Sequence, residues 1–318
     1  MYRSFYGLRV HPFTNTPDPR FLYLSRQAHD AFANLFYSLS RRHGFVVLTG
    51  EVGTGKTMLL TSLVQELRKR RISCAQIVNP NLEPVQFLEL VTTELGVPCA
   101  SREKGALLQG LQRWLQRRNE AGGSATLIVD EAHMMPLETM EELRLLTNFE
   151  TPTGKLLQAV LAGQPELEHM LNLPRMRQLK QRIVSRCRLL PLSLEETQGY
   201  IQSRLTRAGA HQNGIFPADT VQAIRTYSRG IPRLINLVCE NSLIAGYAAQ
   251  MRRIPVEVVE EVAREILAEE ESPVNGATTL PPGHDPVAVP AGAEANPEMW
   301  AAFCEFMKVF NRRQGSGE

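Results

Sequence analysis

The stretch GEVGTGKT, residues 50–57, decides the fold of this chain of 318 residues. It follows an apolar run, GFVVLTG at 44–50, and precedes a segment with helical periodicity, TMLLTSLVQELRKR at 57–70. A glycine-rich turn of this pattern between a buried strand and a helix is typical of a loop that binds phosphates. Glycine lets backbone N–H groups turn toward phosphate oxygens, and the positive end of the helix dipole points to the same place.

Each residue of this turn is a candidate contact with a nucleotide. The expected contacts are Gly50, Glu51, Val52, Gly53, Thr54, Gly55, Lys56, Thr57 and Met58. We expect Lys56 to reach the β- and γ-phosphates and Thr57 to ligate Mg²⁺. The turn therefore predicts ATP and Mg²⁺ as the bound cofactors.

An acidic pair ends another apolar run in TLIVDEAH, residues 126–133. Asp130 suits Mg²⁺, either directly or through water. Glu131 is placed to orient and deprotonate the attacking water, because hydrolysis requires an aligned nucleophile. The two motifs together predict an ATPase that forms ADP and phosphate, with Lys56 and Glu131 as catalytic residues.

Strands alternate with helices on both sides of these motifs. Strands are expected at 44–50, 73–79, 126–131, 156–163 and 188–192, and helices at 27–42, 57–70, 83–96, 104–119 and 136–149. This alternation predicts a three-layer α/β fold, in which helices cover both faces of a parallel sheet. From residue 194 onward only helices are expected, at 194–209, 217–228, 232–250 and 255–270.

We therefore divide the chain into five parts. These are an N-terminal arm (1–24), an α/β domain (25–193), a helical lid domain (194–271), a linker (272–298) and a C-terminal amphipathic helix (299–318). The linker holds six prolines and three glycines without periodicity, which is typical of disorder. Trp300, Phe303, Met307 and Phe310 share one face of the last helix, which either docks on the core or binds a partner.

Composition narrows the class of protein. The net charge of +2 gives no overall field for nucleic acid or membranes, so any such affinity requires a local patch. The cysteines at 74, 99, 187, 239 and 304 show no C-x-x-C spacing, which indicates a reduced chain with buried thiols. No segment approaches the roughly 18 apolar residues of a membrane span, and no signal peptide begins the chain. We expect a soluble, cytoplasmic protein.

Three further polar residues follow predicted elements. Gln164, after the strand at 156–163, either touches the γ-phosphate and lytic water or is a locally bonded loop residue. Asn79 either holds Glu131 away from water or forms a turn. Arg233, in GIPRL at 230–234, either couples the lid to the phosphates or is a surface arginine at a helix start.

The segment RMRQLKQRIVSRCR, residues 175–188, contains six basic residues and no acid. Most such runs are solvated faces. However, the transition state of phosphoryl transfer gains from an inserted guanidinium, which a neighbouring subunit of a ring can supply. Arg186 is the first candidate for this arginine finger and Arg182 the second.

Together and in this order, these motifs resemble those of AAA+ ATPases, and in particular the ExeA-type, or general secretion pathway protein A, family. The likeness begins with FYGL, HPF and PDPRFLYLS and continues through ETMEELRLLTNFET, LAGQPEL, PLSLEET and SRGIPRLINLVCE, over about residues 2–268. The resemblance implies Walker A at 50–57, Walker B at Asp130–Glu131, sensor 1 at Gln164, a finger at Arg186 or Arg182, and sensor 2 at Arg233. It also implies that the arm near Phe21–Tyr23 packs by the adenine, and that the protein forms a homo-oligomeric ring or filament.

The chain departs from that family in two places. Members usually have Gln where this chain has His133. The resulting Asp-Glu-Ala-His is similar to the motif of DEAH helicases, but their tandem core domains exceed this length. Secretion members also carry a membrane span and a cell-wall-binding domain, whereas a linker and one short helix are expected here.

Two cellular roles stay open at this point. One is service to secretion or to envelope and exopolysaccharide machinery, through a protein partner. The other is a DNA-binding regulator of transposition, whose basic segment or RKRR at 68–71 contacts DNA and which recruits a transposase.

Overall fold

Five parallel strands form the central sheet of the computed structural model, which describes residues 2–42, 44–152, 154–210 and 214–271. They are β1 (Phe45–Gly50), β2 (Ile72–Ile77), β3 (Ser124–Val129), β6 (Leu157–Gly163) and β7 (Ile183–Leu189). Their order is β2-β3-β6-β1-β7, and every pairing within this sheet is parallel. The glycine-rich turn therefore leaves the sheet between β6 and β7, and the predicted α/β fold is confirmed.

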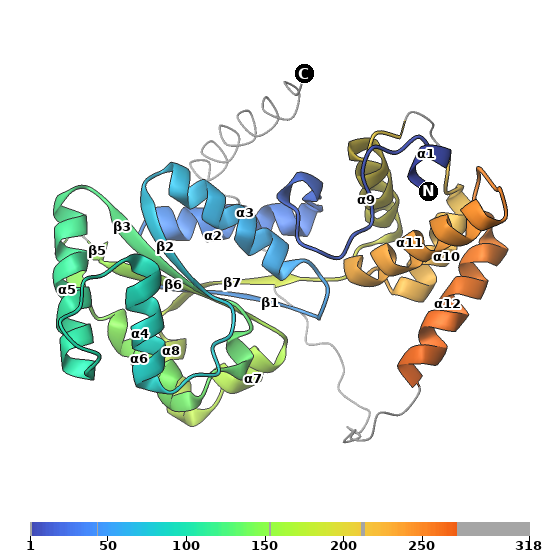
Figure 1. Ribbon diagram of the computed structural model, residues 1–318. Coiled ribbons are helices and arrows are strands. Elements are labelled where there is room, and N and C mark those ends of the chain that lie inside the picture. The colour runs from blue at the N-terminus through green and yellow to red at the C-terminus, as the bar shows by residue number, and fades with distance from the viewer. Residues whose placement is uncertain (1, 43, 153, 211–213, 272–318) are drawn as a thin grey trace.

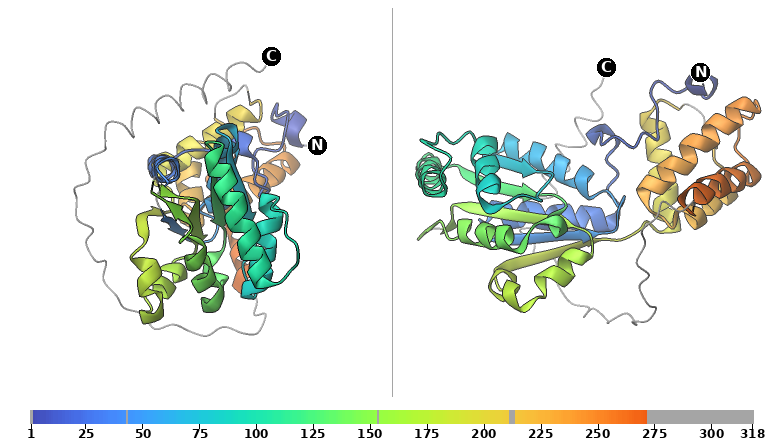
Figure 2. Two further views of the ribbon diagram at one scale, coloured as in Figure 1. Left: turned by 90° about the vertical axis from the view of Figure 1, so that its left-hand side faces the viewer. Right: turned by 60° about the horizontal axis from the view of Figure 1, so that its bottom comes forward.

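Helices cover both faces of this sheet (Figures 1 and 2). One layer contains α2 (Arg26–Ser40) and α3 (Lys56–Lys69). The other contains α4 (Pro84–Leu95), α5 (Lys104–Glu120), α6 (Leu137–Leu146), α7 (Glu166–Leu171) and α8 (Arg177–Lys180).

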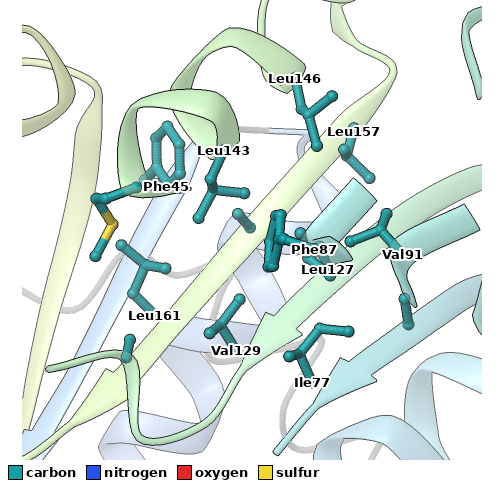
Figure 3. Packing of buried hydrophobic residues seen from close by; sticks show 14 of the residues in the cluster. Phe45, Ile77, Phe87, Val91, Leu127, Val129, Leu143, Leu146, Leu157 and Leu161 are labelled. Carbon is teal, nitrogen blue, oxygen red and sulfur yellow. The ribbon is translucent and has the colours of Figure 1, made fainter. Parts of the chain in front are cut away.

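The central strands are buried on both faces because successive side chains point to opposite sides. Val47 belongs to the cluster under α4, α5 and α6, whereas Val46 packs under α2 and α3. Figure 3 shows the first cluster, in which Phe87 of α4 lies beside Leu127 and Leu143 of α6 lies toward Phe45. This double burial explains why most positions in the central strands are apolar.

The last strand is an exception: the predicted fifth strand is present, but its predicted bounds of 188–192 are wrong. β7 begins at Ile183 and ends at Leu189, so part of the basic segment is an edge strand. Cys187 and Leu189 are buried toward α2, whereas Arg186 and Arg188 are exposed. An edge strand that is solvated on one face alternates in polarity, and the arginines hide this pattern from a search for apolar runs.

Several short elements have no counterpart in the sequence prediction. They are the hairpin of β4 (Glu150–Thr151) and β5 (Gly154–Lys155), helix α1 (Tyr2–Phe5), and the 3₁₀ turns η1 (Pro19–Phe21), η2 (Ala132–Met134) and η3 (Pro174–Met176). Their few residues give no periodicity to detect.

Four helices follow the sheet: α9 (Leu194–Arg207), α10 (Ala218–Ser228), α11 (Pro232–Ala248) and α12 (Val256–Glu271). The arm packs on them, since the Tyr2 hydroxyl donates to Glu240 Oε1 at 2.6 Å and the Tyr6 hydroxyl donates to the Met251 carbonyl at 2.8 Å. Arm and helices share one hydrophobic cluster. The proposed linker and C-terminal helix, 272–318, lie outside the described residues.

Candidate nucleotide-binding site

A pocket of about 380 Å³ lies where the carboxyl edge of the sheet meets the arm and the four-helix part. Its walls include residues 52–59 of the turn and α3, Glu131 after β3, and Arg233 at the start of α11. Phe21 and Tyr23 of the arm line it as well. Ligands of open parallel sheets bind at this edge, so the pocket lies where the fold predicts one.

Lys56 is a buried cation in the wall of the pocket, only 5% exposed. Its Nζ donates to the carbonyl oxygens of Gly50 at 2.7 Å and Glu51 at 3.0 Å. Burial lowers the pKa of Lys56, while the nearby carboxylates of Glu131 and Asp130 oppose this shift. A desolvated ammonium held by carbonyl oxygens and facing a pocket is well suited to bind a phosphate.

The glycines of the turn are required by its backbone and by close approaches. Gly53 and Gly55 have φ of +80° and +98°, in the region that side chains with a Cβ avoid. A Cβ on Gly53 would lie 2.6 Å from Arg233 Cβ, and one on Gly50 would lie 2.8 Å from the Leu189 carbonyl oxygen. The turn therefore fits against β7 and α11 only with glycine.

The two predicted magnesium ligands meet. The Thr57 hydroxyl donates to Asp130 Oδ2 at 2.8 Å, and Asp130 is 1% exposed. A hydroxyl and a carboxylate are hard oxygen ligands that suit Mg²⁺, which is usually held by a few protein groups together with phosphates. No group of three or more His, Cys, Asp or Glu in the described residues would hold a metal by itself. The donor set therefore fits Mg²⁺ that arrives with a nucleotide.

Glu131 directly follows Asp130 and faces the pocket, with a left-handed φ of 50°. Its Oε2 lies 3.4 Å from Nδ1 of His133. On the far side of that ring, Nε2 of His133 lies 3.2 Å from the side-chain nitrogen of Gln164. The structure thus brings the predicted base and the predicted sensor 1 together through His133. Asn79 is exposed, and among the described residues no hydrogen bond joins it to Glu131.

Arg233, the predicted sensor 2, lies against the glycine-rich turn. Its backbone N–H donates to the Gly53 carbonyl at 3.2 Å, and its side chain is exposed. Any shift of α11 relative to the sheet therefore acts directly on the turn.

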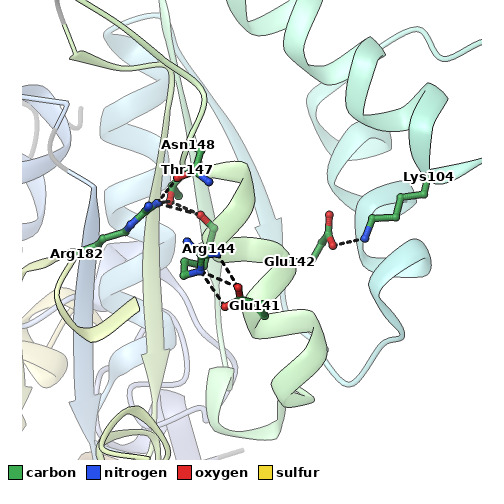
Figure 4. A network of polar contacts seen from close by, with 7 residues as sticks. All are labelled: Lys104, Glu141, Glu142, Arg144, Thr147, Asn148 and Arg182. Carbon is green, nitrogen blue, oxygen red and sulfur yellow. Dashed lines mark hydrogen bonds and ion pairs between the residues drawn. The ribbon is translucent and has the colours of Figure 1, made fainter. Parts of the chain in front are cut away.

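The two candidate fingers have different environments. Arg182 donates to the Arg144 carbonyl at 3.3 Å and to Asn148 Oδ1 at 2.5 Å, at the amino end of β7 (Figure 4). Arg186 lies mid-strand on the exposed face and pairs with Glu168 of α7. The contacts of Arg182 are internal, which favours Arg186 for a role at an interface.

A buried polar cluster at the pocket wall was not predicted from the sequence. Arg204 is 2% exposed and donates to the Tyr200 hydroxyl and to Asn236 Oδ1, both at 2.7 Å. Its guanidinium lies 5.1 Å from the centre of the Phe21 ring. The spacing of Tyr200 and Arg204 places them on one face of α9, but nothing in the sequence shows that this face meets the arm.

Comparison with known proteins agrees with this geometry. A family model described as "AAA domain" matches residues 39–171. General secretion pathway protein A of Aeromonas hydrophila is 44% identical over 256 residues, which is 80% of this chain and 46% of that protein. The chain is an ExeA-like AAA+ protein.

A second curated relative of this AAA+ chain is the ATP-dependent target DNA activator B of Escherichia phage D108. It is 28% identical over 151 residues, 47% of this chain and 45% of that protein. The AAA+ chain thus spans less than half the length of the curated relatives it matches.

Solved structures show the same fold at low identity. The ORC2 protein of Aeropyrum pernix has a TM-score of 0.62 at 17% identity, covering 83% of this AAA+ chain and 72% of that chain. Cdc6p of Pyrobaculum aerophilum also has a TM-score of 0.62, at 18% identity and with 80% and 70% covered. RuvB of Thermotoga maritima has 0.52 at 17% identity, with 76% and 70% covered. Across the described residues, no helix is long and apolar enough to cross a bilayer.

Proposed function

We propose that this chain binds ATP with Mg²⁺, hydrolyses it to ADP and phosphate, and uses the nucleotide state to govern its own assembly and its hold on a partner. The observation that carries this proposal is the convergence of Lys56, the Thr57–Asp130 pair and Glu131 at one edge of the sheet. A phosphate cradle, a metal pair and a base are the groups that ATP hydrolysis requires.

Each group has a definite task. Lys56 exchanges its carbonyl partners for the β- and γ-phosphates. Thr57 and Asp130 would hold Mg²⁺, which supplies charge neutralisation for the phosphates when it is bound. Glu131 orients the lytic water and accepts its proton as the water oxygen attacks the γ-phosphorus.

The test is the steady-state ATPase rate of Glu131→Gln. The amide keeps the shape but accepts no proton, so turnover should fall by about 10²–10⁴-fold while ATP still binds. Glu138→Gln, at an exposed position in the first turn of α6, is the matched control and should turn over as the parent does. Normal hydrolysis by Glu131→Gln would exclude Glu131 as the base.

Assembly is proposed to be a ring or filament of identical subunits. Arg186 lies on the exposed face of edge strand β7, where its contact with Glu168 can be exchanged for a neighbour's γ-phosphate. Arg186→Ala should lower turnover at unchanged ATP affinity, and should act dominantly in mixtures with the parent protein. Arg182→Ala is the contrasting variant. Strictly additive rates in the mixtures would count against a finger that acts across an interface.

The partner is proposed to be a protein of secretion or envelope and exopolysaccharide machinery, met in the cytoplasm. The support is the 44% identity to a protein named general secretion pathway protein A. This role is supported if a secretion component encoded in the same operon co-purifies with the parent protein only when ATP is present, and does not co-purify with Lys56→Ala. Recovery of equal amounts of that component with the parent protein and with Lys56→Ala would argue against this role.

DNA is the second candidate partner, and a basic surface favours it. We call this surface the basic end. It lies where the strands of the sheet begin, on the side opposite the pocket. It consists of Arg41, Arg42, Arg68, Lys69, Arg70, Arg71, Arg117 and Arg118, accompanied by Glu66 and Glu120. Arg118 donates to the Arg71 carbonyl at 2.9 Å, and Arg42 donates to the Gly123 carbonyl at 3.1 Å, so three helix ends form one surface. Arginine forks suit phosphates.

Duplex DNA binding in the presence of ATP tests this alternative. The logarithm of affinity should fall with the logarithm of salt concentration by about 0.9 for each phosphate contacted. Arg68→Gln combined with Arg71→Gln should weaken binding and flatten that slope, whereas Arg253→Gln, an exposed control far along the chain, should not. Absence of DNA binding at low salt with ATP would eliminate this role.

A further inference from the structure

His133 lies between the ends of two neighbouring strands. β3 pairs with β6, so the residues that follow them meet at the carboxyl edge of the sheet. From this position Nδ1 of His133 faces Glu131 Oε2 at 3.4 Å, and Nε2 faces the side-chain amide of Gln164 at 3.2 Å. The histidine side chain is only 14% exposed, so its contacts are with protein groups more than with water.

Glu131 has an unsatisfied carboxylate oxygen beside this neighbour. Its Oε2 is buried and accepts no hydrogen bond from the described residues, and its backbone has a φ of 50°. Such a conformation costs about 1–3 kcal/mol and persists only where surrounding groups fix it. The distance of 3.4 Å to His133 is slightly longer than a hydrogen bond, so a small movement of the ring or carboxylate makes or breaks it.

A neutral imidazole has one donor and one acceptor, which gives two arrangements here. With the proton on Nδ1, the ring donates to Glu131 and Nε2 accepts from the Gln164 side-chain amide, while the Gln164 backbone N–H loses Nδ1 as its acceptor. With the proton on Nε2, the ring donates to the Gln164 side-chain oxygen, and Nδ1 is left to the Gln164 backbone N–H, 3.5 Å away. Which face of its amide Gln164 presents therefore decides whether Glu131 has a donor.

We propose that His133 is a positioning residue that couples Gln164 to the carboxylate of Glu131. Glu131 lines the pocket whereas His133 lies behind it, so a donor on Oε2 holds the carboxylate with its other oxygen toward the water. Gln164 sets the tautomer that provides this donor. The inference rests on the proposed ATPase function, since Glu131 is the base of that reaction.

The test measures kcat and KM for ATP in the full chain with matched variants. His133→Ala should lower kcat about 10-fold and leave KM within about twofold, because the ring contacts the base and not the nucleotide. His133→Asn places an amide where Nδ1 lies and should recover part of the rate. His133→Gln places its amide where Nε2 lies. It therefore keeps the contact with Gln164 but loses the contact with Glu131, and its kcat should resemble that of His133→Ala.

A double-mutant cycle with Gln164→Ala tests the coupling itself. Two residues that act through one contact lose less together than the product of their separate losses. The double variant should therefore be about as slow as the slower single variant, and His133→Ala should have no effect in the Glu131→Gln background. Multiplicative losses, a parent-like kcat for His133→Ala, or a rise in KM alone would each overturn the inference. If the parent protein hydrolyses ATP but the variants give one of these contradicting results, the inference about His133 fails and the proposed ATPase function stands. If the parent protein has no ATPase activity, both the inference and the proposed function fail.

Discussion

Replacing Gly53 by alanine tests how tightly the glycine-rich turn fits against the lid helix. At φ +80° an alanine costs about 1–2 kcal/mol of backbone strain. Its Cβ would lie 2.6 Å from Arg233 Cβ, an atom fixed to the backbone of α11, so the contact is relieved only if helix or turn moves. Overpacking of this kind costs about 1–3 kcal/mol. We expect Gly53→Ala to lower the free energy of unfolding by about 2–5 kcal/mol.

Gly55→Ala separates the two contributions. Gly55 has φ +98°, but a Cβ added there would meet no atom within 4 Å, so only the strain of about 1–2 kcal/mol should appear. Arg233→Gly, which removes the opposing Cβ, should restore part of the stability of Gly53→Ala but not of Gly55→Ala. The assay is urea denaturation followed by circular dichroism. Equal losses for both glycine variants, or no recovery in the double variant, would refute the close fit of turn and lid.

Three further outcomes follow from the packing. Arg182→Met should cost about 0.5–1.5 kcal/mol of unfolding free energy, because it removes the hydrogen bonds to the Arg144 carbonyl and to Asn148 Oδ1, yet should spare ATP affinity; unchanged denaturation midpoints would contradict this. Leu127→Ala, at a fully buried site, should cost about 2–5 kcal/mol, whereas Leu145→Ala, 41% exposed, should stay within about 0.5 kcal/mol; similar losses by calorimetry would contradict the described core. Burial raises the pKa of Cys187 to about 11. In the Cys99→Ser/Cys304→Ser variant, thiol labelling of the folded protein should therefore be slow at pH 8 and should accelerate only as the pH approaches about 11. Rapid labelling at pH 8 would contradict the burial of Cys187.

The strands of this fold could be predicted wherever both faces are buried. β1, β3 and β6 are such strands, and each appears in the sequence as a mostly apolar run, although Thr126 in β3 and Gln158 in β6 are polar. β7 could not be found in this way, because Arg186 and Arg188 occupy its solvated face. Its signal is the alternation that ends with Cys187 and Leu189, a period of two that the search for apolar runs misses.

The site was predictable where one local motif supplies the chemistry. Lys56 and Thr57 follow from the turn, and Asp130 follows from the end of a strand. The contact of His133 with Gln164 joins residues 31 positions apart and depends on β3 and β6 being neighbours, which the alternation of strands and helices does not specify. The cluster around Arg204 likewise depends on where the arm crosses α9.

The most direct test of the account is calorimetric titration of the full chain with ATP and Mg²⁺. The parent protein should bind ATP saturably, and Lys56→Ala should lose this binding, while Lys69→Ala, an exposed lysine at the end of α3, should bind as the parent does. A parent protein that binds no ATP at millimolar concentration, or a Lys56→Ala protein that binds it equally well, would contradict the central claim that this buried ammonium and its glycine-rich turn hold the triphosphate.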